Sequence, residues 1–267
     1  MNARRLLQTG DIDLRATLKP IGVYSRDPTT RWTSKSFSKA VLTPDGPGTM
    51  SLSWDGGGAT TAEAWGSGAA WLLDRAPHWV GLRDDLEGFD PTIHPRIAEL
   101  ARRHPGIRLA SAGVIWQELL LVLLGQRVTT EEAVKSWARM VHTWGEPAPG
   151  PLDLRLPPTP SAVAAATYVD LHRFNVERRR ADAILLSARR ANRLEEAATG
   201  LHEMTAALER GQPLRARPLG RGRLPRRGGA LSPLRLPRLP VGPSHAHFPK
   251  AERLGGAYRH LGRAPRH

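Results

Sequence analysis

The hydrophobic pattern of the chain has two periods, and it changes about a third of the way along. Before the change, short segments alternate apolar and polar residues and are separated by turn residues, which is typical of half-buried strands. Segments 11–20 and 49–54 each place their apolar residues on one face. Residues 43–48 form a turn that could join 39–42 to 49–54 as a hairpin. Segment 57–65 is predicted to be a third strand.

A short helix is predicted next, within segment 66–81. Pro77 is expected to end this helix, because proline has no backbone N–H to donate. Together, the strands and this helix predict a small N-terminal accessory domain with an antiparallel sheet over residues 11–90.

From Pro91 onwards the apolar residues recur at a helical spacing. Segment 112–126 is apolar on nearly every face, so it is predicted to be a buried central helix. Thr129 and Glu132 form a capping box that marks the start of the next helix. Further helices are predicted at 95–104, after Thr159, within 175–194 and at 199–210. The chain is therefore predicted to be an α+β protein whose sheet domain precedes a mostly helical domain, residues 91–209.

The charge of the chain is concentrated at one end. The net charge is +14, but residues 210–267 hold thirteen Arg and one Lys against a single acid, Glu252, which leaves +1 for residues 1–209. The same 58 residues contain nine Pro and nine Gly, a composition typical of disordered segments. Residues 210–267 are therefore predicted to be a disordered basic tail, and the high pI describes this tail rather than the body.

Several classes of protein are excluded by composition. The chain has no Cys, which excludes disulfides and thiolate metal sites. No apolar signal segment follows the start, and the longest apolar run, Leu119–Leu124, is too short to span a membrane. The His residues show no metal-ligand spacing, so no metal site is predicted. We expect an intracellular, cytoplasmic protein that is associated with the nucleoid when bound to DNA and has no membrane partner.

Two segments resemble the DNA-3-methyladenine glycosylase II group of the helix-hairpin-helix DNA glycosylase superfamily. RHPGIRLASAGVIWQELLLVLLGQRVTTEEAVKSW resembles the pre-domain helix, the central helix and the turn that follows it in that group. GEPAPGPLDLRLPPTPSAVAAATYVDLHRFNVERRRADAILLSARRANRLEE resembles its entry segment, short helix and Arg-rich helix. The preceding sheet is similar to the accessory domain of the group. The resemblance extends from residue 11 to about residue 209 and rests on the order and spacing of several segments.

The resemblance implies base excision repair. Enzymes of this group bind double-stranded DNA, flip a damaged base out of the stack and hydrolyse its N-glycosidic bond, without a metal or organic cofactor. This chain is expected to be a monomer. A carboxylate near the sugar is needed because the departing base leaves an oxocarbenium-like charge. The expected partner is double-stranded DNA with a damaged base, and the sequence does not specify which lesion is preferred.

The resemblance assigns DNA-binding roles to two residues. The turn LLGQRVTT matches the family segment that enters the gap left by the flipped base, which makes Gln126 and Arg127 the candidates. The family more often has an apolar wedge at the position of Arg127. The alternative is that both residues only solvate a turn between two helices.

Other residue groups have a structural and a functional interpretation. Trp116, Trp137 and Trp144 could line an aromatic base pocket, but an inward helical stripe favours core packing for the last two. The arginines in 178–180 and 188–190 could contact phosphate, although such charges are more often the solvated face of a helix.

The residues that complete the family pattern are missing from the sequence after Glu209. The helix 199–210 matches the first arm of the helix-hairpin-helix, which should be followed by a Gly-x-Gly hairpin, a second helix and the catalytic Asp. Residues 210–267 contain no Asp and no Trp, so no catalytic residue is assigned. The tail could be a basic nucleic-acid arm, a linker in place of a lost lobe, or the translation of a shifted reading frame, which we favour.

The sequence therefore predicts a 3-methyladenine-type DNA glycosylase whose domain is truncated inside the helix-hairpin-helix, and which is expected to be inactive. The alternative function is non-enzymatic nucleic-acid binding through the basic tail, residues 210–267.

Overall fold

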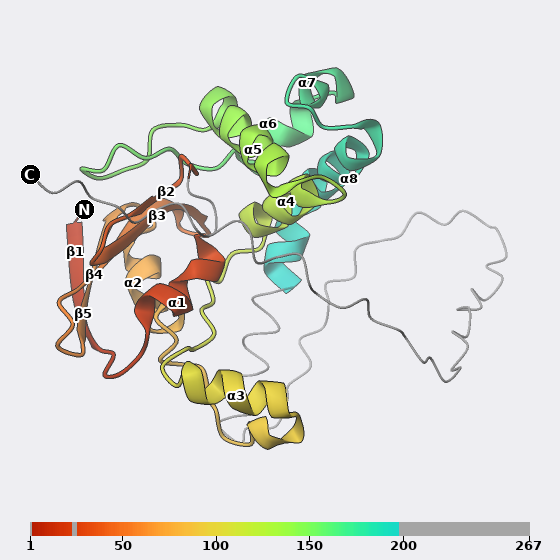
Figure 1. Cartoon of the computed structure of the whole chain (residues 1–267). Helices are drawn as coiled ribbons and strands as arrows, with labels where there is room; N and C mark the ends of the chain where they lie inside the picture. Colours follow the sequence, from red (N-terminus) through yellow and green to blue (C-terminus); the bar gives the residue numbers. More distant parts are fainter. Residues whose placement is uncertain (1, 23–25, 198–267) are drawn as a thin grey trace, which may run out of the picture. The chain divides into compact units, whose positions relative to one another are not determined.

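The computed structural model describes residues 2–22 and 26–197 (Figure 1). The predicted helix 199–210 and the basic tail 210–267 lie outside the described residues. The described chain is α+β, with an antiparallel sheet followed by a helical region, which confirms the predicted fold class.

The N-terminal part contains five strands and two α-helices. They are β1 (Asn2–Gln8), α1 (Leu14–Leu18), the 3-10 helix η1 (Lys19–Ile21), β2 (Thr30–Trp32), β3 (Ser36–Thr43), β4 (Gly46–Trp54), β5 (Ala59–Gly66) and α2 (Ala69–Trp79). The strands form one sheet in the order β1-β5-β4-β3-β2, and every neighbouring pair is antiparallel.

The predicted hairpin and third strand are confirmed as β3, β4 and β5. In the hairpin, Thr43 pairs with Gly46, so the connection is shorter than the predicted turn at 43–48. Gly46 has φ +112°, a conformation that side chains rarely adopt, and its carbonyl accepts a hydrogen bond of 2.7 Å from the Thr43 hydroxyl. A glycine and a side-chain hydrogen bond together close this turn.

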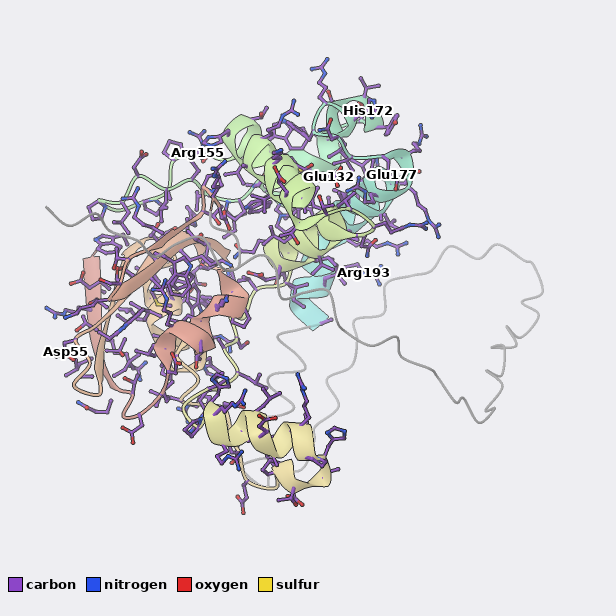
Figure 2. The ribbon with its side chains drawn as sticks, in the orientation of Figure 1. Asp55, Glu132, Arg155, His172, Glu177 and Arg193 are labelled. Atoms are coloured by element: carbon purple, nitrogen blue, oxygen red, sulfur yellow. The ribbon has the colours of Figure 1, made fainter. Side chains whose placement is uncertain are left out.

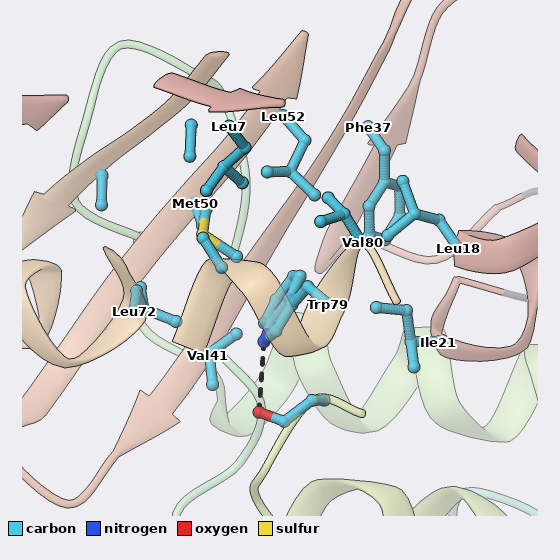
Figure 3. Close-up of a cluster of buried hydrophobic side chains, with 14 of the residues drawn as sticks. Leu7, Leu18, Ile21, Phe37, Val41, Met50, Leu52, Leu72, Trp79 and Val80 are labelled. Atoms are coloured by element: carbon cyan, nitrogen blue, oxygen red, sulfur yellow. Dashed lines mark hydrogen bonds between the residues drawn. The ribbon is translucent and has the colours of Figure 1, made fainter. Parts of the chain in front are cut away.

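One face of the sheet is covered by α2, and the side chains between them form an apolar core (Figure 3). Phe37, Met50, Leu52, Leu72 and Trp79 are fully buried there. The indole of Trp79 donates a hydrogen bond of 3.3 Å to the carbonyl of Ala112, a residue in the segment that precedes α4.

Two predictions for the N-terminal part are wrong. Segment 11–20 was predicted as a strand, but it contains α1, which begins after Asp13 because the Asp13 carboxylate accepts a hydrogen bond from the Ala16 N–H. Helix α2 continues past Pro77 to Trp79. The carbonyl of Leu73, which would have bonded to an N–H at position 77, instead accepts a hydrogen bond of 3.0 Å from the Arg5 guanidinium.

The helical part follows a short 3-10 helix, η2 (Pro91–Ile93). Its helices are α3 (Pro95–Arg103), α4 (Trp116–Gly125), α5 (Thr130–Trp144), α6 (Pro160–Ala165), α7 (Tyr168–His172) and α8 (Arg178–Arg189), and residues 191–197 are also helical. Helix α4 contacts both α5 and α8, and their apolar side chains form a second core.

The central helix α4 is less buried than predicted. Leu120 and Leu124 are fully buried, but Val122 is 61% exposed. More exposed apolar surface lies earlier in the chain. Of the twelve large apolar side chains exposed in the described part, eight lie between residues 82 and 109, in and around α3.

Two buried polar contacts join the sheet to the helices. The indole of Trp137 on α5 donates a hydrogen bond of 2.7 Å to Asp27, just ahead of β2. The ammonium of Lys39 on β3 lies 2.6 Å from Glu118 on α4, and it also donates to the carbonyl of Ile21 at 2.7 Å. Because Asp27, Lys39 and Trp137 are buried and each has a defined partner, these contacts fix how α4 and α5 meet the sheet.

The capping box predicted at the start of α5 is confirmed and leads to a pH-dependent prediction. Glu132 lies in the first turn of α5 (Figure 2). The Thr129 N–H and hydroxyl donate to it at 2.9 and 2.8 Å, and these bonds lower the pKa of the Glu132 carboxyl below its ordinary value. Replacing Thr129 with alanine is expected to lower the free energy of unfolding by about 1 kcal/mol at neutral pH. Thr143→Ala, in the same helix and exposed, is the matched control.

The stability that Glu132 contributes depends on its charge. Because the folded-state pKa is lowered, the contribution is complete above the ordinary carboxyl range and disappears as the pH falls through the folded pKa. The gap in melting temperature between the wild type and Thr129→Ala should therefore narrow as the pH falls below the ordinary carboxyl range. A gap that stays constant, or that widens in acid, would contradict this assignment.

Candidate functional site

The turn after α4 contains both residues that the sequence assigned to DNA binding. Gln126 and Arg127 are exposed and adjacent, between the end of α4 at Gly125 and the capping box of α5. Gln126 is held by a backbone hydrogen bond of 3.4 Å to the Leu123 carbonyl. Arg127 has φ +59°, which places a side chain other than glycine in the left-handed region. The turn therefore presents two long polar side chains from a backbone that is unusual and well defined.

A hollow of about 300 Å³ lies beside this turn, between α4 and the segment around η1. It is lined by Pro20, Ile21, Asp27, Glu118, Leu121, Val122, Gly125 and Gln126. Its walls are mainly apolar, and two carboxylates and one amide supply the polar groups. The lining therefore combines apolar walls with a few polar groups.

Both carboxylates at the hollow already have partners. One Asp27 oxygen accepts hydrogen bonds from the Thr29 N–H, the Thr29 hydroxyl and the Trp137 indole, at 2.7 to 2.8 Å. Glu118 forms its ion pair with Lys39, which is 2% exposed. These contacts are structural in character, and they leave neither group as an unengaged base.

The tryptophans considered for a base pocket lie in the core. Trp116 and Trp137 are 3% and 1% exposed, and the Trp116 indole donates a hydrogen bond of 2.8 Å to the Pro158 carbonyl. Trp144 is half-buried and packs edge-on against Phe174 at 4.9 Å. Among the residues that line the described hollow there is no aromatic side chain.

The three arginines at the start of α8 differ in role. Arg178 and Arg179 are exposed, as a solvated helix face would be. Arg180 is 7% exposed and donates to the carbonyls of Leu124 and Asn175, so neither phosphate contact nor a solvated face describes it. This role was not predicted from the sequence. A signal for it was present, since Arg180, Ile184 and Ala188 are spaced four residues apart and therefore share the buried face of α8.

A second charged residue that the sequence analysis missed caps the other end of α4. The Glu195 carboxylate accepts hydrogen bonds from the N–H groups of Ile115 and Trp116, the shortest at 2.7 Å. A carboxylate at this position satisfies N–H groups that have no partner within the helix. No local signal indicates it, because 79 residues separate Trp116 from Glu195.

Neither a cluster of metal-ligating side chains nor a membrane-spanning helix is present in the described part of the chain. Within residues 2–22 and 26–197, no group of three or more His, Asp or Glu side chains is arranged to hold a metal ion. No helix in this part of the chain combines the length and the apolar character needed to cross a lipid bilayer.

Comparisons with known proteins give matches at the level of structure. A 3-methyladenine DNA glycosylase from Archaeoglobus fulgidus matches with a TM-score of 0.58 and 15% identity, over 70% of this chain and 66% of that one. MBOgg1 in complex with a low-affinity DNA ligand matches with a TM-score of 0.55 and 14% identity, over 72% of this chain and 64% of that one. The described chain has the fold of a DNA glycosylase.

An 8-oxoguanine glycosylase/lyase from Clostridium acetobutylicum, solved with double-stranded DNA containing cytosine opposite 8-oxoguanine, also matches, with a TM-score of 0.53 and 11% identity. The match extends over 66% of the Clostridium acetobutylicum protein. This chain therefore spans slightly less than two thirds of the length of each of these three glycosylases. No family model and no curated protein matches the sequence. At these identities, the likeness establishes a glycosylase fold but not a substrate or an activity.

Proposed function

We propose that this chain recognises damaged double-stranded DNA with the scaffold of a 3-methyladenine-type DNA glycosylase, and that it does not hydrolyse the N-glycosidic bond. The observation that carries the proposal is the Gln126–Arg127 turn, which is exposed, held in an unusual conformation and placed at the edge of a hollow. In this proposal, Gln126 and Arg127 enter the opened base stack, and the chain acts as an intracellular monomer on a duplex.

The hollow beside the turn supports recognition of a damaged base. An alkylated purine carries a positive charge, and the acidic residues Asp27 and Glu118 line the hollow together with Gln126. Apolar walls from Ile21 and Leu121 suit the faces of a planar ring. A base extruded from the duplex would lose its stacking contacts and gain polar and apolar contacts in the hollow.

The absence of hydrolysis is proposed from the carboxylates. Glycosidic cleavage needs a carboxylate that can stabilise the charge developing on the sugar. At the hollow, Asp27 is engaged by three hydrogen-bond donors and Glu118 by Lys39. The sequence after Glu209 contains no Asp that could take this role.

Two assays test the proposal with the full chain. Release of 3-methyladenine from alkylated DNA should stay at the no-enzyme background, whereas the Archaeoglobus fulgidus glycosylase releases base under the same conditions as a positive control. Turnover comparable to that control would overturn the proposed inactivity.

The second assay measures binding to a labelled duplex with one abasic site and to the same duplex intact. The wild type should prefer the abasic duplex, and the double variant Gln126→Ala/Arg127→Ala should lose about tenfold in affinity for it, as expected for lost hydrogen bonds from a charged group. Arg102→Ala on α3 removes an equal charge and should keep the preference. Equal binding of both duplexes by the wild type would refute damage recognition.

The alternative function, non-enzymatic binding of nucleic acid through the tail, is favoured by one observation: residues 210–267 carry thirteen Arg and one Lys. This alternative predicts affinity that falls steeply with salt, does not distinguish abasic from intact duplex, and disappears when residues 210–267 are deleted.

A further inference from the structure

Arg180 is a buried cation whose guanidinium, within the described part of the chain, donates hydrogen bonds to two backbone carbonyls. Its guanidinium donates to the Leu124 carbonyl at 2.9 Å and to the Asn175 carbonyl at 3.2 Å. The nearest carboxylate, Glu177, lies 3.8 Å away and is largely exposed. Burying a guanidinium is costly unless its donors are satisfied in a fixed arrangement, so this site holds two distant backbone segments together.

Both segments contain an unusual backbone conformation. Among the described residues, Arg127 and Asn175 are the two non-glycine residues with positive φ, at +59° and +62°. Arg180 binds the carbonyl of Asn175 itself and the carbonyl of Leu124, three residues before Arg127. Residues with side chains persist in the left-handed region when their surroundings enforce it, and such positions cluster at functional sites.

Helix α4 is held by opposite charges at its two ends. Glu195 accepts from the N–H groups of Ile115 and Trp116 at the N-terminal end, and Arg180 donates to Leu124 at the C-terminal end. A carboxylate at the N-terminus and a cation at the C-terminus both complement the helix dipole. Both side chains come from the stretch 180–195, so this stretch fixes where α4 ends and where the next turn begins.

We propose that Arg180 is a positioning residue for DNA recognition, which fixes the Gln126–Arg127 turn in the conformation that enters an opened base stack. This inference rests on the proposed function. Arg180 itself is buried and touches no DNA. Its effect is to order the backbone of the turn before binding, so that this part of the ordering entropy is not lost when DNA binds.

The test compares Arg180→Met with Arg179→Met in the full chain. Both variants remove one positive charge from the start of α8, but Arg179 is exposed and its side chain has no part in the two carbonyl contacts. Affinity is measured for a duplex with one abasic site and for the same duplex intact. The ratio of the two affinities should fall about threefold to tenfold in Arg180→Met and stay at the wild-type value in Arg179→Met.

A general loss of stability would weaken binding to both duplexes alike, so the ratio separates positioning from folding. Far-UV circular dichroism and a cooperative melt establish that Arg180→Met is folded. If Arg180→Met does not fold, Arg180→Lys replaces it in the test, because lysine keeps the charge but lacks the planar guanidinium that reaches both carbonyls. In that variant, amide hydrogen exchange in residues 125–128 should accelerate more than exchange in the C-terminal half of α5.

Two results would overturn the inference. One is a folded Arg180→Met protein that keeps the wild-type ratio. The other is unchanged exchange in residues 125–128 of Arg180→Lys. If the wild type itself does not prefer the abasic duplex, the proposed function fails, and the hydrogen exchange alone decides whether Arg180 positions the turn.

Discussion

Replacement of Trp137 by alanine is expected to lower the free energy of unfolding by about 3–5 kcal/mol, a large share of the total stability of a typical domain. Trp137 is 1% exposed in the core between α4, α5 and α8. The substitution leaves a cavity and also removes the hydrogen bond from the indole to Asp27. Urea denaturation followed by far-UV circular dichroism measures the loss.

Trp137→Phe separates the two contributions. It keeps most of the ring volume and removes the donor to Asp27, which retains its bonds from Thr29. The expected loss is about 1–3 kcal/mol, smaller than for alanine. If Trp137→Ala unfolded at the wild-type urea concentration, the buried position of this indole would be wrong.

Replacement of Glu118 by alanine is expected to lower the free energy of unfolding by about 3 kcal/mol, because it leaves the buried Lys39 ammonium without its counter-ion. Lys39→Met is expected to lower it less. In that variant the remaining charge is Glu118, which is 33% exposed and can be solvated by water. The structure therefore predicts an order of effects that the sizes of the two side chains would not suggest.

The double variant Lys39→Met/Glu118→Ala provides the control for this pair. Once the ammonium is absent, removal of the carboxylate should have little further effect, so the double variant should be about as stable as Lys39→Met. Urea denaturation of the four proteins completes the cycle. A Glu118→Ala protein that is more stable than Lys39→Met would contradict the buried ion pair.

Features set by neighbouring residues could be predicted from the sequence. The capping box at Thr129 and Glu132, the β3–β4 hairpin and helix α8 all depend on residues within a few positions of one another. Each involves a hydrogen bond or a periodicity that is complete within its own segment, so packing against the rest of the chain did not change it.

The hydrophobic pattern of segment 11–20 could not distinguish helix α1 from a strand. It has five residues, and Leu14 and Leu18 satisfy both the alternating pattern and the helical one. The difference lies in Asp13, whose side chain caps the helix, and in Thr17, which is fully buried beside Leu18. In so short a segment, a single capping residue decides between the two structures.

The supports of the candidate site depend on distant packing. Lys39, Glu195 and Arg180 are charged residues, which are ordinarily expected at the surface. Their partners lie 79, 79 and 56 residues away, at Glu118, Trp116 and Leu124. Only the position of Arg180 on an inward stripe could have been noticed in advance, whereas Gln126 and Arg127 were proposed because the short sequence of their turn resembles a segment of a known family.

The exposed apolar residues around α3 are expected to promote self-association of the protein. Ile93 is 83% exposed and Leu109 is 76% exposed, and Phe89, Ile97 and Leu100 are also in contact with solvent. Surface of this kind is removed from water most readily by a second molecule. The fraction of the chain that stays monomeric should therefore be limited by residues 82–109 and should fall as the protein concentration rises, even where every contact around α4 is intact.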